Sequence, residues 1–199
     1  MSNRVYVFRA FVRLWHWSQA ALIITLLATG FEVHGSYHLL GFERAVYYHT
    51  IAAWSLIGLW VFAIFWHVVT GEWRQYVPTM KRVGEMARFY SSGIFKGEDH
   101  PYQRTPHLKH NPLQRLTYLF MLVVIGPIIW VSGLLYLFYD QWLTTAASAW
   151  LSIDQVALFH TAGAFVMLAF LISHVYLITT GPTIGAHLKA MITGWETEH

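Results

Sequence analysis

Four long apolar segments constrain the fold of this chain of 199 residues more than any other feature. They lie near residues 16–33, 46–70, 116–139 and 156–179. Each is about as long as the roughly 20 residues that an α-helix needs to cross ~30 Å of hydrocarbon. Charged residues make up only 12% of the chain, about half of their usual share in a soluble domain. The sequence therefore predicts an all-α integral membrane protein, a single domain over residues 1–199 with four transmembrane helices.

Basic residues are distributed unevenly between the segments that join the apolar runs. Of the 13 lysines and arginines, all but Arg44 lie in the first 15 residues, in the 71–115 loop or in the C-terminal tail. The opposite loops hold Arg44 together with the acidic residues Glu43, Asp140 and Asp154. The positive-inside rule then places both termini and the 71–115 loop in the cytoplasm. This asymmetry explains the net charge of +3, so we expect membrane lipid and no nucleic acid as a partner.

Three further observations narrow the possible chemistry. The chain has no cysteine, which excludes iron–sulfur clusters, covalently attached c-type haem and disulfides within it. No small-residue cleavage site follows the first apolar run, so we interpret that run as a retained anchor. We recognise no internal repeat, because each half contains a pair of apolar runs but the halves share no pattern. In the long loop, MKRVGEMARFY predicts a short basic amphipathic helix, and EDHPYQRTPHLKHNP predicts an irregular segment.

Histidines inside the apolar runs are the main functional signal. Ionisable residues within a membrane are costly and are by default functional candidates. A single one is equally well explained as a neutral imidazole bonded to a carbonyl of the next helix. Several histidines at matching depths in the membrane favour a shared function instead. Five of the 12 histidines lie in the apolar runs or at their edges: His16, His49, His67, His160 and His174.

The spacing of these histidines gives their depths. His160 and His174 are 14 residues apart on one run, which is about 21 Å along a helix and about 40° short of four full turns. Both rings therefore project from nearly one face. His49 begins the second run from the outside and shares the depth of His160. His16 begins the first run from the inside and shares the depth of His174, so two cross-helix pairs result.

A pair of imidazoles facing each other across a helix bundle suits a b-type haem with two axial histidines. Zinc needs three or four ligands at about 2 Å from the metal, which groups separated by most of a bilayer do not provide. A transporter or channel needs a polar pathway, but the helix centres contain almost no acidic residues, with Glu32 only at an edge. The histidines therefore predict a four-transmembrane-helix bundle that binds two b-type haems.

Small and basic residues near the histidines are further candidates. Small side chains leave room for flat rings, although close helix packing explains each of them at least as well. Arg13 and Arg115 are candidates for contact with haem propionates at the inner side. The small residues in question are Gly30, Gly58, Gly133 and Gly163.

Several short motifs then occur in a characteristic order. They are FVRLWHW followed by ATGF, YYHTIAAW at the second run, KHNPLQ before the third, and LFHTAG with ISHVY on the fourth. Together they resemble the cytochrome b subunits of membrane-bound nickel–iron hydrogenases, the gamma subunits of respiratory formate dehydrogenases and thiosulfate-reductase-type cytochromes b. The resemblance extends from about residue 8 to residue 180, and GEWRQYVPT is similar to the thiosulfate-reductase-type branch.

The resemblance implies a four-helix, two-haem electron conduit in the bacterial inner membrane. It assigns His16 and His174 as axial ligands of the cytoplasmic-side haem iron, and His49 and His160 as axial ligands of the periplasmic-side haem iron. These are the same pairs that the depths of the histidines predict.

The resemblance also implies a quinone site close to the inner haem. Asn111 occupies the matching position, and its neighbours His110 and Gln114 are further quinone-binding candidates. His67 departs from the family pattern. It lies 18 residues after His49, about 27 Å deeper on the same helix face. We consider it an alternative haem ligand, a proton relay or an interfacial polar group.

The function that the resemblance implies is that of a membrane-anchoring di-haem subunit of a respiratory oxidoreductase complex. It would pass electrons between a periplasmic redox partner and the quinone pool, ubiquinone or menaquinone, without acting alone on the partner's substrate. The partner would be a hydrogenase, a molybdoenzyme iron–sulfur subunit or a multihaem cytochrome c. The alternative is a stand-alone b561-type quinone oxidoreductase of the superoxide oxidase kind. Such a protein needs a basic outer funnel for its anionic substrate, whereas these outer loops are mainly acidic.

Overall fold

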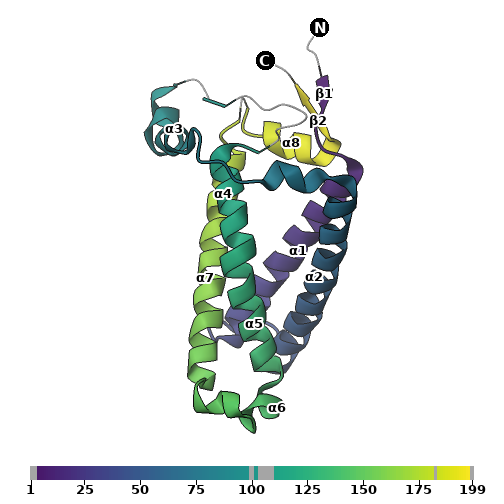
Figure 1. Cartoon of the computed structure of the whole chain (residues 1–199), viewed down its shortest axis with the longest axis vertical. Coiled ribbons are helices and arrows are strands. Elements are labelled where there is room, and N and C mark those ends of the chain that lie inside the picture. The colour runs from purple at the N-terminus through teal and green to yellow at the C-terminus, as the bar shows by residue number, and fades with distance from the viewer. Residues whose placement is uncertain (1–3, 99–100, 103–109, 182, 198–199) are drawn as a thin grey trace. The chain divides into compact units, whose positions relative to one another are not determined.

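The computed structural model describes residues 4–98, 101–102, 110–181 and 183–197, and these residues are mostly helical (Figure 1). Here η1, η3 and η5 are 3₁₀ helices, and η2 and η4 are π-helical turns. In chain order the elements are β1 (Arg4–Tyr6), α1 (Ala10–Val33), α2 (Phe42–Thr70), η1 (Glu72–Tyr76), α3 (Val83–Arg88), η2 (Phe89–Gly93), η3 (Ile94–Lys96), α4 (Pro112–Phe120), η4 (Met121–Ile125), α5 (Gly126–Leu137), α6 (Tyr139–Leu143), η5 (Ala146–Ala149), α7 (Ile153–Ile178), α8 (Ala186–Thr193) and β2 (Trp195–Thr197).

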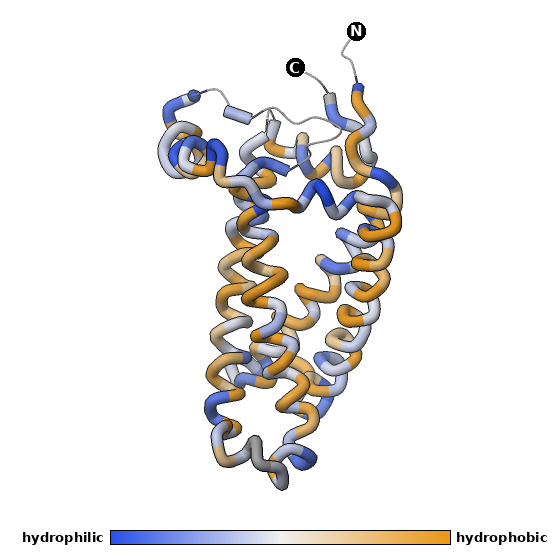
Figure 2. Tube along the Cα trace, viewed as in Figure 1, coloured by the Kyte–Doolittle hydropathy of each residue, from blue (hydrophilic) through white to orange (hydrophobic). Residues whose placement is uncertain are grey.

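Four helical segments of the described chain are long and apolar enough to cross a membrane: α1, α2, the segment Pro112–Leu137 and α7. This confirms the prediction of a mainly helical chain with four membrane-capable helices. Each segment begins three to six residues before its predicted start. Figure 2 shows their predominantly hydrophobic residues. Large apolar side chains such as Phe62 and Phe65 are more than half exposed, as contact with lipid requires.

The third membrane-capable segment combines α4, η4 and α5 into one helical stretch. Pro127 explains the π-helical turn in its middle. Proline lacks a backbone N–H, and its ring clashes with the carbonyl group four residues earlier in a regular α-helix. The wider turn η4, directly before α5, gives that ring room without ending the helix.

The chain divides into two compact units. Unit 1 comprises residues 1–77, 102–110 and 176–199, and therefore holds α1, α2, η1, α8 and both strands. Unit 2 comprises residues 78–101 and 111–175, and therefore holds α3, the α4–α5 segment, α6 and most of α7. Each unit thus contains membrane-capable helices of its own.

In unit 1 the two ends of the chain are joined. Strands β1 and β2 pair in antiparallel fashion, and the rings of Tyr6 and Trp195 lie 5.1 Å apart. The Arg13 guanidinium donates a hydrogen bond to the Ile192 carbonyl at 2.5 Å. Figure 1 shows β1 and β2 side by side. This agrees with a topology in which both termini share one side of the membrane, and the assignment of that side to the cytoplasm stays a prediction.

The loop between α1 and α2 is held by one buried carboxylate. Glu32 is 4% exposed, and its Oε1 accepts backbone N–H bonds from Leu39, Leu40 and Gly41 at 2.5–2.8 Å. Gly41 precedes α2 with a φ of 87°, in a region that favours glycine. Glu32 therefore fixes the start of the helix that carries His49.

We expect Glu32→Ala to lower the melting temperature of the solubilised protein by several degrees. The substitution leaves three backbone N–H groups at the start of α2 without their shared acceptor, and the loop between α1 and α2 loses its anchor. Glu43→Ala makes the same change at an exposed position in the first turn of α2 and should have a smaller effect. Equal shifts in the two variants would contradict this role of Glu32.

In unit 2 the predicted amphipathic helix corresponds to α3 and η2. Met86 and Phe89 are buried, whereas Arg82 and Arg88 are exposed and pair with Glu85 and Glu98. This is the division into apolar and charged faces that the sequence predicts. The irregular segment that the sequence predicts after it falls largely on residues 99–100 and 103–109, which lie outside the described residues.

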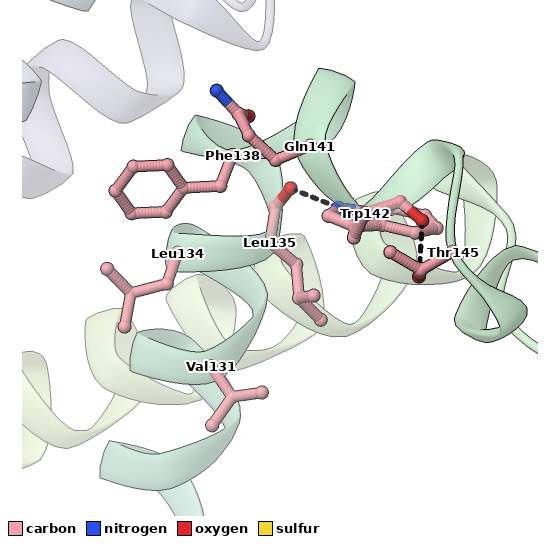
Figure 3. A pocket seen from close by; sticks show the side chains of 7 residues that line it. All are labelled: Val131, Leu134, Leu135, Phe138, Gln141, Trp142 and Thr145. Atoms are coloured by element: carbon pink, nitrogen blue, oxygen red, sulfur yellow. Dashed lines mark hydrogen bonds between the residues drawn. The ribbon is translucent and has the colours of Figure 1, made fainter.

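A shallow recess lies where α5 meets α6 (Figure 3). Trp142 closes it by donating its indole N–H to the Leu135 carbonyl at 2.7 Å, and the Trp142 carbonyl accepts the hydroxyl of Thr145 at 2.7 Å. The lining is mainly aliphatic and aromatic and contains no titratable side chain. The hydrogen bonds of Trp142 and Thr145 therefore stabilise the corner between α5 and α6.

Candidate functional site

In unit 1 the ring of His49 is held by α1. His49 is the eighth residue of α2, and its Nδ1 lies 3.0 Å from the hydroxyl oxygen of Thr29. The same hydroxyl lies 2.7 Å from the Thr25 carbonyl, to which it donates. A hydroxyl has one proton, so the Thr29 oxygen accepts from His49 and Nδ1 carries the ring proton. In the neutral ring, Nε2 then has the lone pair that binds a metal.

In unit 2 the ring of His160 is held in the same manner by α5. His160 is the eighth residue of α7, and its Nδ1 lies 3.0 Å from the Ser132 hydroxyl and 3.2 Å from the Ile129 carbonyl. Because a carbonyl only accepts, Nδ1 must donate. The Ser132 hydroxyl donates to the Ile128 carbonyl at 2.5 Å. His160 therefore has the same tautomer as His49.

A glycine lies against each of these two rings. A Cβ atom at Gly30 would lie 3.1 Å from Cε1 of His49, and a Cβ atom at Gly133 would lie 3.2 Å from Cε1 of His160. Gly163 instead packs against Ile129, and a Cβ at Gly58 would meet nothing within 4 Å. Of the four glycines that the sequence suggests, two thus make room for histidine rings and one serves helix packing.

The two units therefore share a local pattern that the sequence analysis missed. In each, a hydroxyl residue followed by glycine faces the eighth residue of a later long helix, which is histidine. The interpretation that the halves share no pattern was wrong at this level. The dipeptides Thr29–Gly30 and Ser132–Gly133, each inside an apolar run, are the signal that would have revealed it.

The inner histidines complete a second level in each unit. His16 precedes Thr29 by 13 residues on α1, about 20 Å along the helix, and His174 follows His160 by 14 residues on α7. His16 lies beside the ring of Trp17, and His174 lies beside that of Phe170. Each unit by itself thus carries histidines at two similarly spaced levels, and in unit 1 the ring of His67, 5.1 Å from that of Trp15, lies near the His16 level as well. The pairing of rings from different units stays a prediction.

Polar atoms near His16 are suited to a ligand with a polar edge. Arg13 Nε, Trp15 Nε1 and Gln19 Oε1 are buried on α1 within one turn of His16, and none has a hydrogen-bond partner among the described residues. Buried polar groups normally find partners. Within unit 1, these three atoms therefore suit a ligand that brings polar substituents to the His16 end of α1.

Asn111 caps α4. Its Oδ1 accepts the Gln114 backbone N–H at 2.8 Å, and Gln114 Oε1 accepts the Asn111 backbone N–H at 3.0 Å, which is a capping box. The Asn111 amide also donates to the Tyr90 hydroxyl at 3.1 Å, and the residue is 1% exposed. Helix capping thus accounts for these side chains in a way that the sequence analysis did not consider. Their role in quinone binding stays a prediction.

His67 lies in a cluster of rings in unit 1. Its Nδ1 donates to the Ala63 carbonyl of its own helix at 2.7 Å. Its ring lies 5.1 Å from Trp15 and 5.4 Å from Tyr76, and Tyr76 lies 5.1 Å from His110. His67 and the quinone candidate His110 therefore contact the same tyrosine.

Comparisons with known proteins identify relatives over almost the whole chain. Residues 7–194 match the family model described as prokaryotic cytochrome b561. The chain is 32% identical over 203 residues to a protein of Escherichia coli (strain K12) named as a cytochrome, YdhU, covering 97% of this chain and 75% of that one. It is 25% identical over 219 residues to a protein of Rhizobium leguminosarum bv. viciae named as a Ni/Fe-hydrogenase B-type cytochrome subunit, covering 96% and 87%. No solved structure matches the chain.

Proposed function

The chain belongs to the prokaryotic cytochrome b561 family, and from this premise we propose that it is the membrane-anchoring di-haem subunit of a respiratory oxidoreductase complex. Family membership makes it a membrane cytochrome of electron transport with b-type haem. The further steps of the proposal are two haems, a quinone site at the cytoplasmic side and a redox partner at the periplasmic side of the bacterial inner membrane.

The observation that carries the proposal is the arrangement of histidines at two levels in each unit. We assign the Nε2 atoms of His49 and His160 as axial ligands at the periplasmic side, and His16 and His174 as the ligands at the cytoplasmic side. The tautomers of His49 and His160 support this, because Nδ1 carries the proton and Nε2 the lone pair. Haem iron, when bound in this way, accepts and releases single electrons.

Arginines at the inner ends of the helices suit the propionate groups of the inner haem. Arg13 lies one turn before His16, and its Nε is buried without a hydrogen-bond partner among the described residues. Arg115 is buried one turn after Asn111. A guanidinium binds carboxylates in a bidentate, charge-assisted manner. We therefore assign both arginines to the inner end of the site.

Quinone binding is proposed at the start of α4. Asn111, His110 and Gln114 carry amide and imidazole groups that donate hydrogen bonds to a quinone carbonyl. Reduction of a quinone consumes protons, and histidine is suited to deliver them near neutral pH. The ring contacts of Tyr76 with His67 and His110 place His67 beside a quinone candidate. Its Nδ1 proton is donated to the Ala63 carbonyl, so Nε2 suits either a proton relay or a haem ligand.

The partner is proposed to be a periplasmic redox subunit. A relative that is named as a hydrogenase cytochrome subunit and that matches 96% of this chain supports this. A hydrogenase, a molybdoenzyme iron–sulfur subunit and a multihaem cytochrome c remain the candidate classes. The family description also suits the alternative, a stand-alone quinone oxidoreductase acting on a soluble outer reductant such as superoxide.

The experiment that tests the proposal is spectroscopy of the purified native complex. We expect a reduced-minus-oxidised spectrum of b-type haem, two haems per polypeptide in a pyridine haemochrome assay, and reduction of the haem by added quinol. One haem per polypeptide, or no response to quinol, would contradict it. A co-purifying redox subunit is expected for the complex, whereas superoxide-dependent quinone reduction by the isolated chain would instead establish the alternative.

A further inference from the structure

Thr29 and Ser132 occupy equivalent positions in the two units, and neither of them has a role in the ligand assignment above. Each is 4% exposed in a membrane-capable helix, and each donates its hydroxyl proton to the carbonyl four residues earlier in the same helix. Each oxygen lies 3.0 Å from the Nδ1 atom of a histidine on another helix of the same unit. Each hydroxyl oxygen is therefore an acceptor for its histidine, because its own proton is already donated to a backbone carbonyl.

An acceptor at Nδ1 changes how an imidazole binds a metal through Nε2. It fixes the tautomer and the orientation of the ring, and it makes the ring a stronger electron donor. A hydrogen bond of this kind is electrostatically stronger in the low dielectric of a membrane interior than in water. A stronger donor stabilises ferric over ferrous iron, and therefore lowers the reduction potential.

Ordinary helix self-bonding does not explain the arrangement. Thr25, one turn before Thr29, makes the same bond to the carbonyl four residues earlier, but it is not among the buried residues. Thr29 is followed by Gly30, whose missing side chain lets the His49 ring approach α1. Ser132 is followed by Gly133, which does the same for His160. The close approach and the acceptor occur together in both units.

We propose that Thr29 and Ser132 are positioning residues for the periplasmic-side haem. Their hydroxyl oxygens accept the Nδ1 protons of His49 and His160, orient the two rings and lower the reduction potential of the iron that the rings bind. This proposal rests on the assignment of His49 and His160 as axial ligands. It adds that hydroxyl acceptors on two different helices lower the reduction potential of one haem.

Thr29→Val tests the proposal because it removes the acceptor at nearly constant shape. In a redox titration followed at the haem absorbance, we expect one of the two components to rise in potential. Loss of an outer partner of a metal ligand changes metal affinity or activity by ~10–100-fold. We expect a shift of about tenfold in the equilibrium between ferrous and ferric haem, which corresponds to ~59 mV for one electron. Ser132→Ala should raise the same component by less, because the Ile129 carbonyl remains as an acceptor for His160.

Two matched variants separate the hydroxyl from its surroundings. Thr25→Val makes the same chemical change one turn away, and Thr29→Ser keeps the hydroxyl while removing the methyl group; both should titrate like the unaltered protein. Unchanged potentials in Thr29→Val, or equal shifts in Thr29→Val and Thr29→Ser, would overturn the proposal. If Thr29→Val loses haem, retention of haem in Thr29→Ser still supports a role of the hydroxyl, and loss in both overturns it.

The ligand assignment itself is tested separately by haem content. If His49→Ala and His160→Ala keep both haems, the ligand assignment fails. If those variants lose haem but Thr29→Val keeps both its haem and its potential, only the positioning role fails. The two results are therefore distinguishable in the same set of preparations.

Discussion

Alanine in place of His160 is expected to lower the haem content from two haems to one per polypeptide, and alanine in place of His49 is expected to do the same. An iron held by two axial imidazoles loses one of its two bonds to the protein when either ring is removed. The apolar space around the macrocycle remains, so weak residual binding at that level is the most that we expect. Pyridine haemochrome analysis per polypeptide measures the effect.

Double variants test which rings share a haem. If His49 and His160 bind one iron, His49→Ala/His160→Ala retains the other haem, whereas His49→Ala/His174→Ala retains none. His34→Ala removes an exposed histidine directly after α1 and should keep both haems. Two haems in either single variant, or equal haem contents in the two double variants, would exclude the proposed pairs.

Valine in place of Gly30 or Gly133 is expected to remove most of the periplasmic-side haem and leave the cytoplasmic-side haem in place. A single added Cβ would already lie 3.1 or 3.2 Å from a histidine ring carbon, and valine adds two methyl groups at that point. In a closely packed interior such overpacking forces side chains away from their preferred positions. The ring would then move off the geometry that its hydroxyl acceptor holds. The measurement is the haem content, together with the redox titration that distinguishes the two haems.

Gly58→Val is the matched control for the glycine variants. Gly58 lies within α2, as His49 does, and a Cβ atom there would meet nothing within 4 Å. The same substitution in a helix of the same unit should therefore retain both haems. Loss of haem in all three variants would mean that valine disturbs these helices generally. It would argue against a specific role of Gly30 and Gly133 in making room for the histidine rings.

Much of the fold follows from the length and apolar character of four runs. A run of about 20 apolar residues leaves few structures other than a helix across the membrane, so the number of membrane-capable helices was predictable. The start of the third helix was less predictable. Its cap at Asn111 depends on a reciprocal bond with Gln114, and the sequence analysis considered that asparagine only for its functional role.

The candidate site was predictable in its histidines but not in what holds them. A histidine in an apolar run is conspicuous because few polar residues occur there. Thr29 and Ser132 are not conspicuous, since buried hydroxyl groups commonly donate a hydrogen bond to a carbonyl of their own helix. Their role emerges only when a second helix brings a ring to the same oxygen. Sequence spacing alone does not show which face of one helix meets which face of the next.

The pairing of β1 with β2 has a practical consequence for work on this chain. Because hydrogen bonds join β1 and β2, the first and last described segments of the polypeptide lie next to each other. A fluorescent protein attached at the beginning and one attached at the end would emit from the same aqueous compartment and within range of energy transfer. A circularly permuted gene that joins the native ends through a short linker, and begins instead in an exposed loop, should encode a protein that still inserts and binds its pigment.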